Sequence, residues 1–161
     1  MDVIILDLSS ANIRGECQLE GYKDMIELLS YSHGVAQQIT GDQSNTKRTS
    51  GKPSHQDFTV TKYVDLASCQ LIDFCNQAKN IPTAIVTVGQ NDGGKVTKLI
   101  VYTLTNALIS SVSVGCGGGG KPQETVTFNN TAISWAYAGP QNAANSGDAS
   151  TKWNLATNAT E

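Results

Sequence analysis

Residues 58–80, FTVTKYVDLASCQLIDFCNQAKN, run from an alternating pattern directly into the one segment with helical spacing. In residues 58–64 every second side chain faces the same way, with Phe58, Val60 and Lys62 in one row, and this alternation predicts a half-buried strand. From residue 68 the period lengthens, and the predicted apolar helix face holds Leu71, Ile72, Cys75 and Ala78. A helix of about three turns cannot bury such a face alone, so we expect it to lie on a sheet.

The ends of this helix are marked by side chains suited to them. Asp65 offers a carboxylate to the first turn, and Ser68 is a second capping candidate. Lys79 suits the negative end of the helix, Asn80 can take the left-handed position that ends it, and Pro82 prevents continuation.

The rest of the chain favours strands. With 161 residues it suits one domain, and its 16% of charged residues and many Gly, Ser, Thr and Asn residues are typical of strands and turns. Residues 90–94, QNDGG, predict a hairpin centred on Asp92–Gly93, and residue 106 is expected to follow another tight turn. We expect about seven or eight strands in a β-barrel or sandwich with the helix packed on it. The predicted strands are residues 2–8, 16–20, 21–35, 58–64, 83–89, 96–105, 106–114 and 124–137.

Two of these strands have imperfect alternation. Residues 21–35 place apolar side chains on both faces, which predicts a strand buried on both sides or one that bends so that each half serves a different sheet. In residues 124–137 the apolar set moves from even to odd positions across Asn129–Asn130. Such a switch indicates a bulge or a change of sheet.

Two segments lack any regular period. Residues 37–56 form a polar stretch with a locally basic centre, and a loop of this length in a compact domain is commonly functional or disordered. Residues 139–161 are poor in apolar side chains, and we predict a domain of residues 1–138 followed by a flexible tail.

Catalytic and ligand-binding patterns are sparse. His33 and His55 lie at no metal-ligand spacing, and the glycines at 115–120 lead to Lys121–Pro122 and a strand instead of the helix of a phosphate loop, so we predict no metal and no cofactor. The four cysteines suggest no disulfide framework, although a Cys–His site assembled in space stays open as a hydrolase alternative.

Charge and hydropathy narrow the partners. The net charge of −3 argues against nucleic acid, and no apolar run is long enough to insert into a membrane. Asp2 and Asp7 interrupt the segment where a Sec signal peptide would be apolar, so we expect synthesis and folding in the cytoplasm.

Several segments, taken in order, resemble the haemolysin-coregulated protein (Hcp) family, the inner-tube subunit of the bacterial type VI secretion system. They are GYKDMIELLSYSHGV, the long polar loop, DFTVTKYVDLASCQLIDFC, LISSVSVG, the Gly-rich link, PQETVTFNNTAISWAY and the final TKWNLATN. The combination of F-T-V-T-K-Y-V-D-x-A-S with E-T-V-T-F and W-A-Y carries the resemblance. Cys69 departs from it, because many relatives have Pro there.

The resemblance implies a mainly β fold, a small β-barrel of two packed antiparallel sheets with one α-helix on its side. It implies a structural protein without catalytic residues, forming homohexameric rings that stack into a tube inside a contractile sheath and beneath a spike protein. The tube would be expelled, without a Sec signal, into a target cell or the medium, carrying small effector proteins in the lumen as receptor and chaperone. A monomeric β-sandwich binding or adaptor module is the alternative.

Loop length and strand polarity supply candidate contact residues for such an assembly. A closed ring needs one patch of a subunit to meet a different patch of the next. In the long loop we expect subunit or ring-stacking contacts from Gln38, Thr40, Asp42, Lys47 and Arg48. Ser30 and Ser32 are candidates for lining the lumen.

Overall fold

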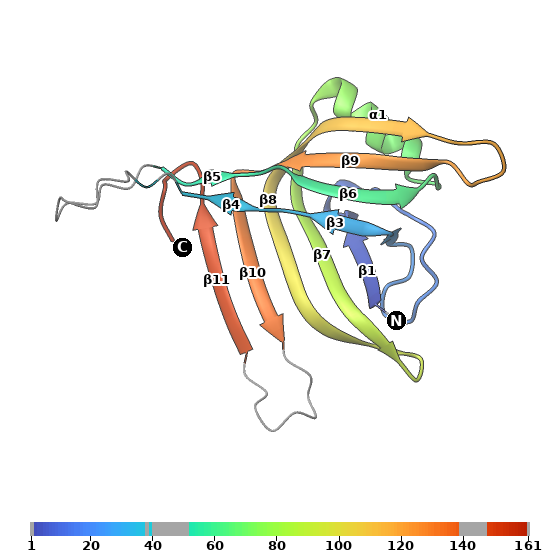
Figure 1. Cartoon of the computed structure of the whole chain (residues 1–161), viewed down its shortest axis with the longest axis horizontal. Coiled ribbons are helices and arrows are strands. Elements are labelled where there is room, and N and C mark those ends of the chain that lie inside the picture. The colour runs from blue at the N-terminus through green and yellow to red at the C-terminus, as the bar shows by residue number, and fades with distance from the viewer. Residues whose placement is uncertain (1, 38, 40–51, 139–147, 161) are drawn as a thin grey trace.

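The computed structural model of this chain describes residues 2–37, 39, 52–138 and 148–160 (Figure 1). Strands dominate this part, and α1 (Ser68–Gln77) is its one α-helix, with a short 3-10 helix η1 (Ser9–Ala11) after the first strand. The strands are β1 (Asp2–Asp7), β2 (Ile26–Leu28), β3 (Ser30–Ser32), β4 (Val35–Ala36), β5 (Ser54–His55), β6 (Phe58–Tyr63), β7 (Ile81–Asp92), β8 (Lys95–Gly115), β9 (Gln123–Asn129), β10 (Ala132–Ala138) and β11 (Asp148–Asn154).

Strand β8 belongs to both layers of the fold. Its first half pairs with β7 and β10, and its second half pairs with β9. Between the halves, Asn106 has a left-handed backbone with φ 51°, which bends the strand without ending it. The prediction of a separate strand beginning at residue 106 was therefore wrong. Asn tolerates the left-handed region better than most residues, so one strand can turn the corner between the layers.

The two ends of the main sheet are consecutive in the chain. The strand order is β2-β1-β7-β8-β9-β6-β3, and only Leu29 separates β2 from β3. Strand β2 pairs with β1, β3 pairs with β6, and the Leu29 N–H donates to the Thr61 carbonyl at 2.7 Å. Of the two alternatives for residues 21–35, the structure has the bend, but the predicted single strand is divided into β2, β3 and β4, and residues 21–25 form no strand. The sheet curls into a sandwich or barrel whose opposite edges meet at this bend without pairing into a closed cylinder.

The switch across Asn129–Asn130 is also a change of layer. Strand β9 lies between β6 and the second half of β8, whereas β10 pairs with the first half of β8. The buried Asn130 side chain donates from Nδ2 to the Ala132 carbonyl at 2.9 Å, which satisfies a polar group inside the corner. The shift of apolar positions thus marks the point where the inward direction reverses.

The barrel core lies between the two layers, and α1 covers it on one side (Figure 1). Leu71 is fully buried and Phe74 and Cys75 are half-buried, but Ile72 and Ala78 are exposed, contrary to the predicted helix face. The helix ends early because Ala78, not Asn80, takes the left-handed conformation with φ 49°. The stripe that touches the sheet is consequently narrower than the sequence pattern suggests. The core comprises Leu6, Leu8, Ile13, Ile26, Leu28, Phe58, Val60, Ala67, Leu71, Ile81, Ala84, Val86, Val88, Leu104, Ala107, Ile109, Val126, Phe128 and Ile133.

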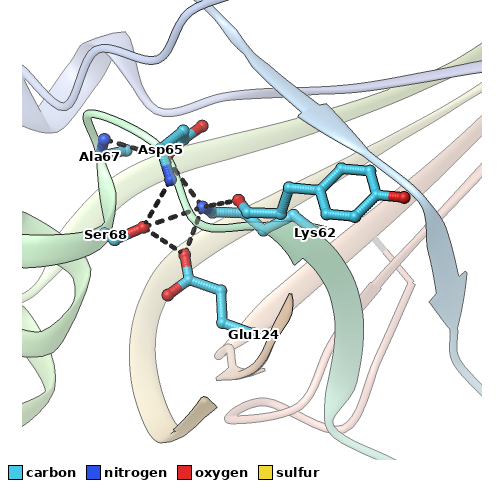
Figure 2. Close-up of polar contacts among 6 residues, drawn as sticks. Lys62, Asp65, Ala67, Ser68 and Glu124 are labelled. Carbon is cyan, nitrogen blue, oxygen red and sulfur yellow. Dashed lines mark hydrogen bonds and ion pairs between the residues drawn. The ribbon is translucent and has the colours of Figure 1, made fainter. Parts of the chain in front are cut away.

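A buried ion cluster holds the point where β6 leads into α1 (Figure 2). Lys62, on the inward row of β6, is fully buried, and its ammonium group forms ion pairs with Glu124 of β9 and, at 2.8 Å, with Asp65. Ser68 Oγ donates to Glu124 Oε1 at 2.8 Å and accepts from the Asp65 N–H at 2.9 Å. Asp65 Oδ1 accepts from the Ala67 N–H at 2.9 Å. The prediction that Asp65 or Ser68 caps α1 was wrong, because the N-cap is Ala67 without a side-chain hydrogen bond; both residues instead hold the turn immediately before the helix.

Three further differences concern turns and ends. The hairpin between β7 and β8 is centred on Gly93–Gly94, where both φ angles are positive, one residue later than predicted. Residues 16–20 form no strand. Strand β11 pairs with β10 over seven residues, although no strand was predicted beyond residue 138. That pairing attaches part of the predicted tail to the sheet, while the domain division at residue 138 stays a prediction.

Candidate functional site

Strands β10 and β11 extend the sheet past the barrel, and we call them the overhang (Figure 1). On its concave face, rows of paired side chains cross from the core to the free edge at β11. Ile133 lies between Leu104 and Trp153, and the next row places Trp135 between Tyr102 and Thr151. The side chains become more exposed toward the edge of the sheet. In the first row Leu104 and Ile133 are fully buried and Trp153 is half-buried. The overhang therefore presents apolar side chains that the barrel leaves uncovered.

Two hollows lie on this face. The larger, of about 460 Å³, opens between the overhang and the β4–β5 ribbon, and its lining residues are Val35, Gln37, Pro53, His55, Trp135, Thr151, Trp153 and Asn158. The smaller, of about 250 Å³, is lined by Ile100, Trp135, Tyr137, Ala149, Ser150 and Thr151. Trp135 and Thr151 line both, so the two hollows form one continuous surface, which we call the overhang surface.

A three-ring cluster attaches the β4–β5 ribbon to the overhang. The ring centroids of His33 and His55 are 6.0 Å apart, and each lies 6.1 Å from that of Trp135. His33 also stacks on Phe58 at 5.5 Å, and its Nδ1 donates to the Gln56 carbonyl at 3.1 Å. The cluster thus joins β6 and β10 to the base of the ribbon.

Three ring nitrogens in and beside this cluster are buried without a hydrogen bond. His33 Nε2, His55 Nδ1 and Trp153 Nε1 are shielded from solvent and have no hydrogen-bond partner in the structure. Burial lowers the pKa of both histidines below the ordinary value, and for His33 the neighbouring His55 charge lowers it further, against a raising effect of the Gln56 hydrogen bond. Both rings are consequently held neutral near pH 7.

The structure describes some of the predicted contact residues but not others. Gln38, Thr40, Asp42, Lys47 and Arg48 lie outside the residues that the structure describes. Ser30 and Ser32 are exposed on β3, paired with Thr61 and Thr59 of β6, and do not line the overhang surface.

The overhang surface was not predicted from the sequence. The signal for it was the row of odd positions Ile133, Trp135 and Tyr137, together with Trp153 in the predicted tail. Local sequence could not show that the two segments pair with each other.

The structure gives no support to a Cys–His site. Within the described ranges no hydrogen bond joins a cysteine to a histidine, and no three potential metal ligands gather. Cys17 lies beside a hollow of about 330 Å³, but its Sγ contacts Glu27 Oε1 at 3.6 Å, and burial and the Glu27 carboxylate raise the pKa of its thiol. A protonated thiol is a poor nucleophile.

Comparisons with known proteins agree on one family. The sequence profile described as "Type VI secretion system effector, Hcp" matches residues 6–137. The chain belongs to the Hcp family. Members of this family are structural, secreted tube proteins of the type VI secretion system and not enzymes, so the resemblance stated from the sequence is confirmed.

Individual relatives cover nearly the whole chain. Protein hcp1 of Pseudomonas aeruginosa is 30% identical over 152 residues, which span 91% of this chain and 92% of that protein. A solved structure described as a type six secretion system protein has a TM-score of 0.90 at 27% identity, with all of both chains covered. Hcp1 from Salmonella typhimurium has a TM-score of 0.81 and covers 99% of each chain, and at 23% identity it supports the fold alone.

Among the described segments, no helix is both long enough and apolar enough to cross a lipid bilayer.

Proposed function

We propose that this Hcp-family tube subunit closes into homohexameric rings by docking its overhang surface against a neighbouring copy. The observation that carries the proposal is the hollowed apolar face of β10 and β11, which the barrel leaves uncovered beside β11, a strand that pairs with β10 alone among the described strands. A ring needs a heterologous contact, in which this face meets a different patch of the next subunit. The family assignment supplies the occupant, because tube subunits assemble with copies of themselves.

The overhang surface has the chemistry of such a contact. Trp135 and Trp153 are half-buried, so a neighbour that covers them would remove further apolar area from water without having to desolvate a charge. None of the residues lining either hollow carries a full charge near pH 7. Aromatic side chains with few charged residues around them are typical of the centre of protein–protein interfaces.

The remaining steps of the function follow from the family. We propose that the rings stack into a tube that a contractile sheath expels beneath a spike protein, with small effectors carried in the lumen. The protein would be made in the cytoplasm and leave without a Sec signal. In this proposal Ser30 and Ser32, both exposed on β3, face the lumen.

The long loop supplies a second set of proposed contacts. Gln38, Thr40, Asp42, Lys47 and Arg48 would reach a neighbouring subunit or ring. Replacing Lys47 and Arg48 together with Glu should then weaken stacking or subunit contact, and stacked rings that remain intact in negative-stain images would exclude these residues.

A matched pair of substitutions on β11 tests the proposed ring contact. Thr151 and Lys152 are adjacent and both exposed, but Thr151 lines the overhang surface and Lys152 faces the other side of the sheet. The wild type should have six times the 17.1 kDa mass of one chain in light scattering. Thr151→Asp should reduce this mass by placing an unpaired charge in the contact, whereas Lys152→Asp should leave it unchanged.

The same measurement separates the alternatives. A wild type that stays at the mass of one chain at every concentration supports a monomeric binding module and contradicts the ring. Equal effects of the two substitutions would show that the ring forms through another surface.

A further inference from the structure

We propose that His33 and His55 form a two-histidine site for a transition-metal ion, which they bind through His33 Nε2 and His55 Nδ1. They are the two histidines of the chain, and the fold brings their ring centroids to 6.0 Å. The proposal concerns a single subunit and does not depend on the proposed ring. It replaces the sequence-based prediction of no metal, because that prediction considered only local spacing, whereas these two rings meet through the pairing of β4 with β5.

The separation of the rings fits one shared ion. Imidazole nitrogens bind such ions at about 2.0–2.1 Å, so two imidazoles on one ion have ring centroids about 5–6 Å apart. The observed separation of 6.0 Å lies at the upper end of this range. The backbone therefore holds the two rings within reach of a single ion.

One nitrogen on each ring has no other partner. His33 Nε2 and His55 Nδ1 are shielded from solvent and make no hydrogen bond. On His33 the position of the proton is fixed, because the Gln56 carbonyl can only accept, so Nδ1 carries the proton and Nε2 keeps its lone pair. Metal-binding histidines commonly donate their other N–H to a backbone carbonyl in this way. His33 consequently has the tautomer and the supporting contact of a metal ligand.

Both rings also have the protonation state that metal binding requires. Burial lowers the pKa of His33 and of His55, so both imidazoles are neutral near pH 7. A neutral imidazole can bind an ion without first losing a proton. An ion between the rings would also give a partner to two buried polar atoms, whose lack of a partner is unfavourable.

The ligand set determines which ions fit. Neutral imidazole suits Zn²⁺, Cu²⁺ and Ni²⁺, whereas Mg²⁺ and Ca²⁺ prefer oxygen ligands. Among the described residues no third histidine, cysteine or carboxylate completes a metal-binding group, so solvent would fill the remaining positions. His55 lines the larger hollow of the overhang surface, which has room for solvent ligands. We therefore expect Cu²⁺ to bind more tightly than Zn²⁺, and Mg²⁺ not to bind.

Trp135 provides a local signal for binding. Its ring centroid lies 6.1 Å from those of both histidines, and Cu²⁺ at such short range quenches tryptophan fluorescence. Titration of the full chain with copper(II) chloride at about pH 7.5, where both rings are neutral, should quench the fluorescence and saturate at one ion per chain. Trp153 is the second tryptophan of the chain, so Trp153→Phe isolates the signal of Trp135. Magnesium chloride should leave the fluorescence unchanged.

Electron paramagnetic resonance identifies the ligands directly. Cu²⁺ on the wild type should show splitting from two nitrogen nuclei, and one nitrogen should be lost in either His33→Asn or His55→Phe. Each substitution should also weaken Cu²⁺ binding by more than about tenfold. The exposed thiols of Cys69 and Cys116 are the competing ligands. The matched control Cys69→Ser, Cys116→Ser should therefore keep the wild-type affinity and both nitrogens.

Three results would overturn the two-histidine site. They are a wild-type spectrum without two nitrogen ligands, an unchanged Cu²⁺ affinity in both histidine variants, and loss of binding in the thiol variant. If a histidine variant does not fold, the wild-type spectrum and the thiol variant still decide between the histidines and another ligand set.

Discussion

Lys62 is a buried residue that holds together the connection between β6 and α1. Its ammonium group is fully buried and is surrounded by the carboxylates of Glu124 and Asp65, the Tyr63 carbonyl at 3.0 Å and Ser68 Oγ at 3.4 Å (Figure 2). A buried ammonium requires such complete pairing because its lost hydration must be replaced. The cluster connects β6, β9 and the start of α1, so it couples the direction of the helix to the register of two strands.

Removing this charge should be strongly destabilising. Lys62→Met leaves the Glu124 carboxylate buried without its cation, and breaking a buried pair in this way reduces the free energy of unfolding by about 3–5 kcal/mol. The control is Lys79→Met, which breaks the exposed pair with Asp73 and should change it by less than about 1 kcal/mol. Urea denaturation of both variants measures the difference, and similar midpoints would show that the buried cluster adds no stability.

Among the elements, strand β8 connects the two layers of the fold. Its length lets it pair with β7, β10 and β9 in turn, and its bend at Asn106 directs the two halves into different layers. A β-branched residue cannot adopt that left-handed backbone without steric strain, whereas glycine can. The residue at this position must therefore accept a left-handed backbone for β8 to keep its bend.

Substitution at the bend should separate backbone strain from side-chain contacts. Asn106→Val should lower the free energy of unfolding by about 1–2 kcal/mol, because valine is strained at a φ of 51°. Asn106→Gly removes the same weak side-chain contact with Asn80, at 3.4 Å, but permits the backbone, and should stay close to wild type. Equal losses in the two variants, measured by urea unfolding, would attribute the effect to the side chain instead of the bend.

At the scale of the molecule, the described residues form a barrel with an added apolar surface. Every member of the core cluster lies before residue 138, whereas β11 pairs only with β10 among the described strands. The proposed function therefore assigns stability and assembly to different parts of one chain. The barrel buries its own core, and the overhang surface remains incompletely covered within a single subunit.

Truncation after residue 138 should separate these two roles. The shortened chain keeps the whole core and should still unfold cooperatively in a thermal circular dichroism scan. It loses Thr151 and Trp153 from the overhang surface, so its mass in light scattering should fall to that of one chain. A truncated chain that does not fold would show that residues 139–161 belong to the domain, and one that retains the ring mass would place the contact elsewhere.

Local patterns in the sequence determined much of the fold. The alternation of residues 58–64, the helical period after residue 68, the bend in residues 21–35 and the switch at Asn129–Asn130 are all present in the structure. These features could be predicted because the period of the side-chain directions depends on neighbours a few residues away, whereas the caps at both ends of the helix were predicted at the wrong residues. The periodicity placed Lys62 in one row with Phe58 and Val60, and the structure showed that this row faces inward.

Only the tertiary structure decided which distant segments meet. Glu124 reaches Lys62, His55 reaches His33, and Trp153 completes a surface with Trp135, yet no local pattern pairs these residues. Likewise, Asn106 permits a left-handed backbone, but its neighbours do not show that β8 uses it to change layers. The physical reason is that strand pairing and burial depend on the folding of the whole chain, so the ion cluster, the three-ring cluster and the overhang surface appear only when the layers are assembled.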